Sequence, residues 1–255
     1  MTTRMKDFTA NRILALLPPR EAEVIVPLLE LTEVQLGDII DQPGKPIQNL
    51  YFPLRAAISV TDISDGHNTV EVTITGSEGC SGASIAQGND QSPCMALIQI
   101  GGPAVRLAAS ALMSNLPRLR YLEGALLRYN ALLLRHAVVS VGCNRFHSHQ
   151  QRLARWLKAH WDRTGLETFP FTMAFLAAQV GLDRDMVSAL VDDLKQRGIV
   201  TKGHATVTIT DHEALTAACC ECFALCKDAT GQYLEALQHL ALTADGDMAD
   251  AANSS

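Results

Sequence analysis

At Leu116 and Pro117 the hydrophobic pattern of the chain changes from a strand period to a helical one, and this change constrains the fold more than any other feature. Before it, apolar residues such as Val70 and Val72 alternate with polar ones, which is typical of a half-buried strand. Turn glycines recur through residues 34–107, and short strands at roughly 8–12 residue spacing predict a small barrel or sandwich. After it, apolar residues recur at steps of three and four, as along one face of a helix. The chain therefore combines a strand-rich first part with a helical second part.

The composition excludes several classes of protein. The chain has 255 residues, 47% of them hydrophobic, and a net charge of −6, so it can bury a core and is not disordered throughout. Its most apolar stretch, residues 124–134, contains Arg128 and Asn130 and is shorter than the roughly 18 residues of a membrane span, so we expect no membrane partner. No apolar segment of a secretory signal follows the N-terminal residues. Seven cysteines, four of them within residues 219–226, indicate thiols in a reducing cytosol rather than disulfides.

The helical part begins with an apolar row that is typical of a coiled-coil seam. Its steps alternate between three and four residues over nearly three heptads. The row predicts a dimer helix, while packing of the same helix on its own barrel is the alternative. The residues in the row are Leu119, Leu122, Leu126, Tyr129, Leu133 and His136.

A helix-turn-helix pattern lies within residues 173–192. Ala177 is small where two helices would touch, Gly181 suits a turn with positive φ, and Val187 would seat the second helix on the first. Alternating residues over 199–210 then predict a hairpin, which makes the unit a winged helix-turn-helix. A helical hairpin without a role in DNA binding is the alternative.

The order of these parts resembles the Crp/Fnr family of bacterial transcription regulators over about residues 11–226. The motifs that carry the resemblance are Leu50-Tyr51-Phe52-Pro53, Gly76-Ser77-Glu78-Gly79, Cys143-Asn144-Arg145-Phe146-His147-Ser148, Gln151-Arg152-Leu153-Ala154-Arg155-Trp156-Leu157 and Ala218-Cys219-Cys220-Glu221-Cys222-Phe223. The resemblance implies an α+β protein with an N-terminal β-roll (a cupin-like jelly roll), a long dimerisation helix and a C-terminal winged helix-turn-helix. It also implies a cytoplasmic homodimer that binds double-stranded DNA at a near-palindromic operator and is not an enzyme. Under this resemblance, a contact with RNA polymerase is also possible.

The resemblance also sets the expected boundaries. N-terminal helices and the β-roll occupy residues 1–110, the dimerisation helix 111–141, and the winged helix-turn-helix 142–215. A C-terminal helix follows over 216–242. The last residues, 243–255, are small, acidic and free of aromatics, and we expect them to be disordered.

In the family, the second helix of this motif enters the major groove. Arg184 matches the arginine that reads guanine, and Asp185 stands where the family usually has a glutamate that accepts from cytosine. Ala189 replaces a second arginine of the best-known members. The residues that we assign to DNA binding are Thr172, Arg184, Asp185, Ser188 and Lys202, the last as a phosphate contact from the hairpin.

The sensor part departs from the members that bind cyclic nucleotides. Ala83 stands where those members have a glutamate for the ribose hydroxyl, and residues 56–105 contain no Lys or Arg to pair with a phosphate. A buried anion without a charge partner is unfavourable. We therefore expect no binding of cyclic AMP, no cofactor, and an effector that the sequence does not identify; a β-roll without any ligand is the alternative.

The C-terminal cysteines support a second hypothesis, a thiol- or metal-based redox sensor. Cys219, Cys222 and Cys226 lie at helical spacing on one apolar face, where they fill a core or hold an ion, and Cys220 lies off this face as the exposed thiol. Cys143 and His147 are also at chelating spacing, with His149 nearby and no fourth ligand evident.

A third hypothesis is a protein-interaction module whose acidic recognition helix no longer binds DNA. Catalysis is not expected, because the chain lacks the Gly-x-Ser-x-Gly, Walker A and Rossmann patterns.

Overall fold

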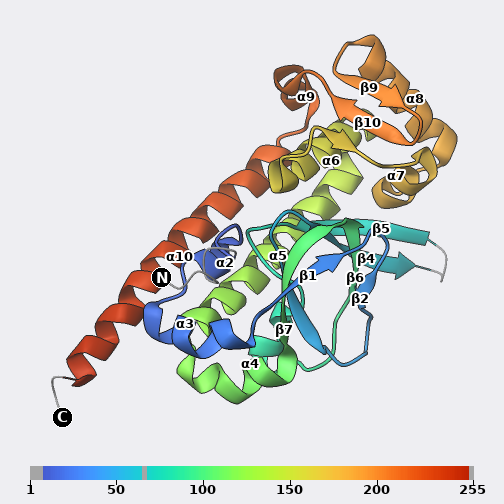
Figure 1. Cartoon of the computed structure of the whole chain (residues 1–255). Coiled ribbons are helices and arrows are strands. Elements are labelled where there is room, and N and C mark those ends of the chain that lie inside the picture. Colours follow the sequence, from blue (N-terminus) through green and yellow to red (C-terminus); the bar gives the residue numbers. More distant parts are fainter. Residues whose placement is uncertain (1–7, 65–67, 253–255) are drawn as a thin grey trace. The chain divides into compact units, whose positions relative to one another are not determined.

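The computed structural model describes residues 8–64 and 68–252, which form two compact units (Figure 1). The first unit contains residues up to Ile58, Thr75–Leu134, and the chain from Asp228 onward. The second unit contains Ser59–Ile74 and Arg135–Lys227. The mixture of helices and antiparallel strands confirms the predicted fold class.

The strands of the first part of the chain form two sheets, as expected for the β-roll (Figure 1). A three-stranded sheet has the order β1-β7-β3, and a four-stranded sheet has the order β2-β6-β4-β5. The bounds are β1 Glu30–Val34, β2 Ile39–Asp41, β3 Asn49–Pro53, β4 Ala57–Ser64, β5 Asn68–Thr75, β6 Met95–Ile100 and β7 Gly102–Ala108.

Short helices precede and connect these strands. They are α2 Arg12–Ala15, α3 Pro19–Ile25, η1 Val26–Leu28, η2 Ala83–Gln87, α4 Ala109–Asn115 and η3 Leu116–Arg118. Asn11 joins α2 to the sheets, because its side chain caps the helix while its amide donates to the carbonyls of Pro53 and Gly79.

Helix α5, Arg120–Phe146, starts later than the expected position 111 and runs past 141. Pro117 lies in the preceding 3-10 turn, and the carboxylate of Glu21 accepts from the amides of Tyr121 (2.6 Å) and Leu122 (3.0 Å), which fixes the helix start. The hydroxyl of Tyr129 then donates to Thr75 at 2.7 Å. These buried contacts place the first half of α5 in the core of the first unit.

The predicted dimer row accordingly faces the interior of a single chain. Leu119, Leu122, Leu126 and Tyr129 are buried in the core of the first unit, with Leu133 partly buried against it. His136, in the second unit, is also buried, and its Nε2 lies 3.2 Å from the Cys226 carbonyl. This arrangement corresponds to the alternative in which the helix packs on its own barrel. A different row of α5 is exposed and apolar: Leu127, Ala131, Leu134, Val138 and Val141.

The second unit contains the winged helix-turn-helix and a three-stranded sheet of order β8-β10-β9. Ser148 and Gln151 form a capping box at the start of its first helix. Rings of Trp156, Phe169 and Phe171 pack against one another in its core. Its elements are α6 His149–Thr164, β8 Thr168–Phe169, α7 Met173–Val180, α8 Arg184–Gln196, β9 Val200–Gly203, β10 Thr206–Ile209 and α9 His212–Ala218.

The C-terminal segment differs from the expected single helix over 216–242 followed by disorder over 243–255. The chain leaves the helical conformation at Cys219, and α10 then runs from Cys222 to Ala252. Leu240, just before the predicted end, and Ala244, just after it, both pack on the core of the first unit, so the helix continues across that position. Residues 253–255 lie outside the described part. Within residues 8–64 and 68–252, no helix combines the length and apolarity that a membrane span requires.

Candidate nucleic-acid interface

The two helices of the motif are held by caps that the sequence supplies. The hydroxyl of Thr172 accepts from the amide of Phe175 at 3.1 Å and starts α7. Gly181 ends α7 with a φ of +65°, which is the left-handed conformation that glycine favours. Asp183 then accepts from the amide of Met186 at 2.7 Å and starts α8. Thr172 thus has a structural role in the motif, in addition to its assignment to DNA binding.

The contact between α7 and α8 is the one that the residue spacing predicts. Ala177 and Val187 are both buried, and Gly181 lies between them in the turn. Leu176, Val180 and Leu194 are buried with them. The rigid seating of α8 leaves one of its faces open to solvent.

Arg184 is the first residue of α8 and is exposed. Among the described residues, none forms an ion pair with its guanidinium group. Asp185 and Ala189 are exposed, and Ser188 is half-buried. A helix N-terminus favours anions, and an arginine there adds a planar donor group that fits a guanine edge or a phosphate.

Lys202 extends from β9 to the recognition helix, and β9 lies beside α8 (Figure 1). Its Nζ donates to both carboxylate oxygens of Asp192, at 3.0 and 3.1 Å, and to the hydroxyl of Ser188 at 2.9 Å. The sequence predicts that Lys202 and Ser188 both bind DNA, and in the structure their side chains contact each other. The lysine therefore braces the wing against α8, and its role as a phosphate contact stays a prediction.

The acidic residues of α8 have partners that reduce their repulsion of a phosphate backbone. Asp192 pairs with Lys202, and Asp193 lies 3.4 Å from the guanidinium of Arg197 and accepts from Gln150 at 3.0 Å. The carboxylate of Asp183, just before α8, accepts the N-cap hydrogen bond from Met186. Asp185 is the remaining carboxylate of this helix for which the described residues show no ion pair.

The β4–β5 strands supply residues to the second unit that the sequence analysis did not single out. Ser59 donates to Glu71 at 3.0 Å and lies 3.4 Å from the amide oxygen of Gln179 in α7. Glu71 also lies 3.7 Å from Nε2 of the fully buried His160. Burial lowers the pKa of His160 to about 3. The sequence contained one indication of this contact, because Gln179 is the polar residue in the otherwise apolar segment that forms α7.

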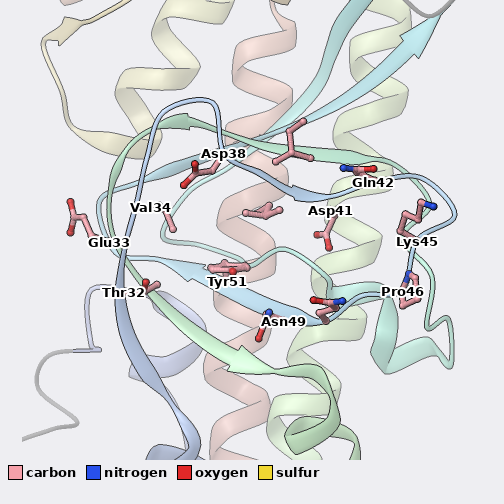
Figure 2. Close-up of a pocket in the computed structure, with 13 residues that line it drawn as sticks. Thr32, Glu33, Val34, Asp38, Asp41, Gln42, Lys45, Pro46, Asn49 and Tyr51 are labelled. Carbon is pink, nitrogen blue, oxygen red and sulfur yellow. The ribbon is translucent and has the colours of Figure 1, made fainter.

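The first unit contains a pocket of about 600 Å³ beside β1, β2 and β3 (Figure 2). Glu33, Asp38 and Asp41 lie along it, and Lys45 is at the end away from Glu33 (Figure 2). Lys45 is the one basic side chain among the thirteen described residues that line the pocket. Burial raises the pKa of Asp41 to about 6. The acidic lining does not favour an anionic ligand.

Ala83, where the resemblance predicts the loss of a ribose contact, is buried in η2. Its carbonyl accepts from the side-chain amide of Asn130 in α5 at 3.0 Å. This segment therefore packs against the long helix.

The cysteines assemble differently from the prediction. Cys220 was expected to be exposed, but it is buried, because the chain breaks between α9 and α10 and turns its thiol toward α5. Its sulfur lies 3.5 Å from that of Cys143. Cys219 and Cys226 are half-buried and lie outside the group of donor atoms formed by Cys143, His147, Cys220 and Cys222.

A winged helix-turn-helix that exposes an arginine at the N-terminus of its second helix is the arrangement of a class of DNA-binding proteins. Comparison with known proteins gives the finer assignment. Residues 151–218 match the family described as the Crp-like helix-turn-helix domain. The chain thus contains a Crp-like helix-turn-helix domain and shares the fold of solved Crp/Fnr-type chains.

Solved structures show the fold over most of the chain. FixK2 from Bradyrhizobium japonicum is 14% identical, with a TM-score of 0.63 over 75% of this chain and 98% of that one. The c-di-GMP responsive global regulator CLP from Xanthomonas campestris is 16% identical, with a TM-score of 0.57 over 74% and 97%. A Crp/Fnr-family chain from Eubacterium rectale is 14% identical, with a TM-score of 0.63 over 79% and 94%. No curated protein matches the chain in sequence.

Proposed function

We propose that the protein is a homodimeric, sequence-specific DNA-binding transcription regulator of the Crp/Fnr type that acts in the cytoplasm. The observation that carries the proposal is the position of Arg184, exposed at the capped N-terminus of a helix seated in a Crp-like helix-turn-helix. Arg184 reads a guanine through its O6 and N7 atoms, and Asp185 contacts a neighbouring cytosine. Contact with RNA polymerase stays a prediction from the family resemblance.

The dimer forms through the exposed apolar row of α5. Leu127, Ala131, Leu134, Val138 and Val141 follow one another at steps of four and three, which is the spacing of a two-helix seam. Leu134 and Val141 are 67% and 71% exposed, so a second copy of the helix would remove their apolar surface from water. Two recognition helices related by this seam would reach half-sites about 34 Å apart, so the operator is near-palindromic.

The effector is not cyclic AMP. The support is the buried Ala83, the absence of Lys and Arg from residues 56–105, and the acidic lining of the β-roll pocket. The pocket accommodates a neutral or cationic small molecule better than a nucleotide phosphate.

The dependence of DNA affinity on salt tests the proposal. Fluorescence anisotropy with a random-sequence duplex should show an affinity that falls steeply as the salt concentration rises, because phosphate contacts release counterions. An absence of binding at low salt would instead support a protein-interaction module with an acidic recognition helix.

A further inference from the structure

Four metal-binding side chains meet at the end of α5. Cys143 comes from the last turn of α5 and His147 from the residue that directly follows this helix. Cys220 comes from the turn after α9, and Cys222 is the first residue of α10. Their donor atoms all lie within 4.8 Å of one another. We propose that these four residues bind a single zinc ion in a Cys₃His site. This site is independent of the proposed DNA binding and lies wholly within the second unit.

The spacing of the donor atoms fits one tetrahedral ion. Zn–S bonds of about 2.3 Å and Zn–N bonds of about 2.0–2.1 Å place neighbouring ligands roughly 3.5–3.8 Å apart in a tetrahedron. The sulfurs of Cys143 and Cys220 are 3.5 Å apart, and the sulfur of Cys222 is 3.6 Å from Nδ1 of His147. Two pairs of ligand atoms, Cys143 with Cys220 and Cys222 with His147, therefore already have the separation that two ligands of one zinc ion require.

The ring of His147 also has a carboxylate partner on the nitrogen that would not bind the metal, as histidine ligands of zinc commonly do. Nε2 of His147 lies 3.1 Å from a carboxylate oxygen of Glu221, while Nδ1 points to the cysteines. An N–H at Nε2 that donates to Glu221 leaves the lone pair of Nδ1 free for a metal. Glu221 comes from the same turn as two of the ligands, so one Cys-Glu-Cys segment supplies two thiols and the orienting carboxylate.

The local fold explains why these residues meet. The amide of His147, just past the end of α5, donates to the carbonyl of Cys143 at 3.2 Å, so the two residues lie one helical turn apart and share a face. A continuous helix over residues 215–226 would have turned Cys220 away from Cys222, but the break at Cys219 gives both thiols the same direction.

The surroundings carry positive charge that suits three thiolates. Three thiolates, a neutral histidine and Zn²⁺ have a net charge of −1. The positive charge of Arg155 acts on Cys143 and on Cys222. Within the described part of the chain, the buried Nε atoms of Arg152 and Arg155 have no hydrogen-bond partner. A metal centre with a net negative charge near these arginines would offset the cost of burying their positive charges.

Other uses of the four residues fit less well. A disulfide needs a sulfur separation of about 2.05 Å, and the 3.5 Å between Cys143 and Cys220 is the distance of two free thiols or two ligands. In a [4Fe–4S] cluster each ligand binds a different iron, and in a [2Fe–2S] cluster two irons share the four ligands, so either cluster spreads the full ligand set more widely than one ion does. Binding of zinc releases the thiol protons to solvent and changes no oxidation state.

Metal analysis of the full chain tests the site. The protein, without a histidine tag, is purified under reducing conditions and its metals are measured by mass spectrometry. We expect one zinc per chain, and loss of that zinc in Cys143→Ser and in Cys222→Ser. Cys226→Ser and Cys219→Ser are matched controls, since both thiols are nearby but outside the donor group, and both variants should keep the zinc.

Cobalt substitution provides a readout that does not depend on whether a variant is less stable. Co²⁺ added to the metal-free protein should give the intense visible bands of a tetrahedral site and a thiolate-to-cobalt charge-transfer band. Glu221→Gln should keep these spectra and weaken the zinc affinity by about 10–100-fold. A wild-type protein without zinc and without cobalt bands, an iron–sulfur chromophore in protein purified without oxygen, or equal zinc loss in Cys226→Ser would each overturn the proposal.

Discussion

Arg184 is the residue on which the proposed sequence recognition depends. Replacement by alanine should weaken binding to the cognate operator by about 1–3 kcal/mol and relax the preference at one base pair per half-site, because a bidentate contact to guanine is lost. Titrations on cognate and scrambled duplexes measure both effects. Lys195→Ala, which removes an equal charge from the last turn of α8, is the control and should leave the base preference intact. An equal loss on both duplexes for Arg184→Ala would make Arg184 a phosphate contact.

His160 couples the stability of the second unit to pH. Its pKa is about 3 in the folded protein, against about 6.5 when unfolded, so the unfolded state binds more protons between these values. Stability is therefore fully present above about pH 6.5 and falls by up to about 1.4 kcal/mol per unit as the pH drops toward 3.

The measurement is urea unfolding at pH 7.5 and pH 5.0 for the wild type and for His160→Phe, which keeps a ring beside Trp156. The wild type should lose about 2 kcal/mol more than the variant between the two conditions. His136, whose pKa burial lowers to about 4, titrates in both proteins and cancels in the comparison. Equal losses in the two proteins would show that His160 takes up its proton without unfolding.

Among the elements, α5 is the helix through which we propose that two chains associate. Leu134→Glu together with Val141→Glu should convert the dimer to a monomer, because each carboxylate would be buried in the seam without a partner. Sedimentation velocity measures the change. Leu31→Glu, on an exposed residue of β1, is the control and should leave the dimer intact. A dimer that persists in the double variant would place the interface on another surface.

The same helix shows how far periodicity can predict an element. The steps of three and four from Leu119 to His136 correctly indicate a helix with one apolar face. They do not show which partner covers that face, because a seam to another chain and a contact with the chain's own core need the same side chains. The second apolar row, through Leu134 and Val141, is only separable from the first once the burial of each residue is known.

The winged helix-turn-helix was predictable because its constraints are local. Ala177, Gly181 and Val187 have the predicted positions. A glycine turn with positive φ and the helix contact on either side of it depend only on residues that are close in sequence. The cysteine cluster was not predictable in full. Cys143 lies 77 residues from Cys220, and the two meet only because the helix breaks at Cys219. Helical spacing alone grouped Cys219, Cys222 and Cys226 instead.

For the whole molecule, cyclic AMP should leave DNA affinity unchanged. Anisotropy titrations on one duplex, with and without millimolar cyclic AMP, should superimpose, because the β-roll offers the phosphate no basic partner over residues 56–105. Calorimetry of the nucleotide with the full chain is the companion measurement. Micromolar binding accompanied by a shift in DNA affinity would show that the β-roll uses the family's effector despite Ala83.

Selection of binding sites from a pool of random duplexes tests the central claim most directly. The purified full-length protein should enrich an inverted repeat whose half-sites are centred about 10 base pairs, or roughly 34 Å, apart, with one G·C pair in each half-site that Arg184→Ala no longer selects. This result requires both a dimer and base readout by α8. Enrichment of no motif, or of a single unrepeated site that Arg184→Ala selects equally well, would contradict the account.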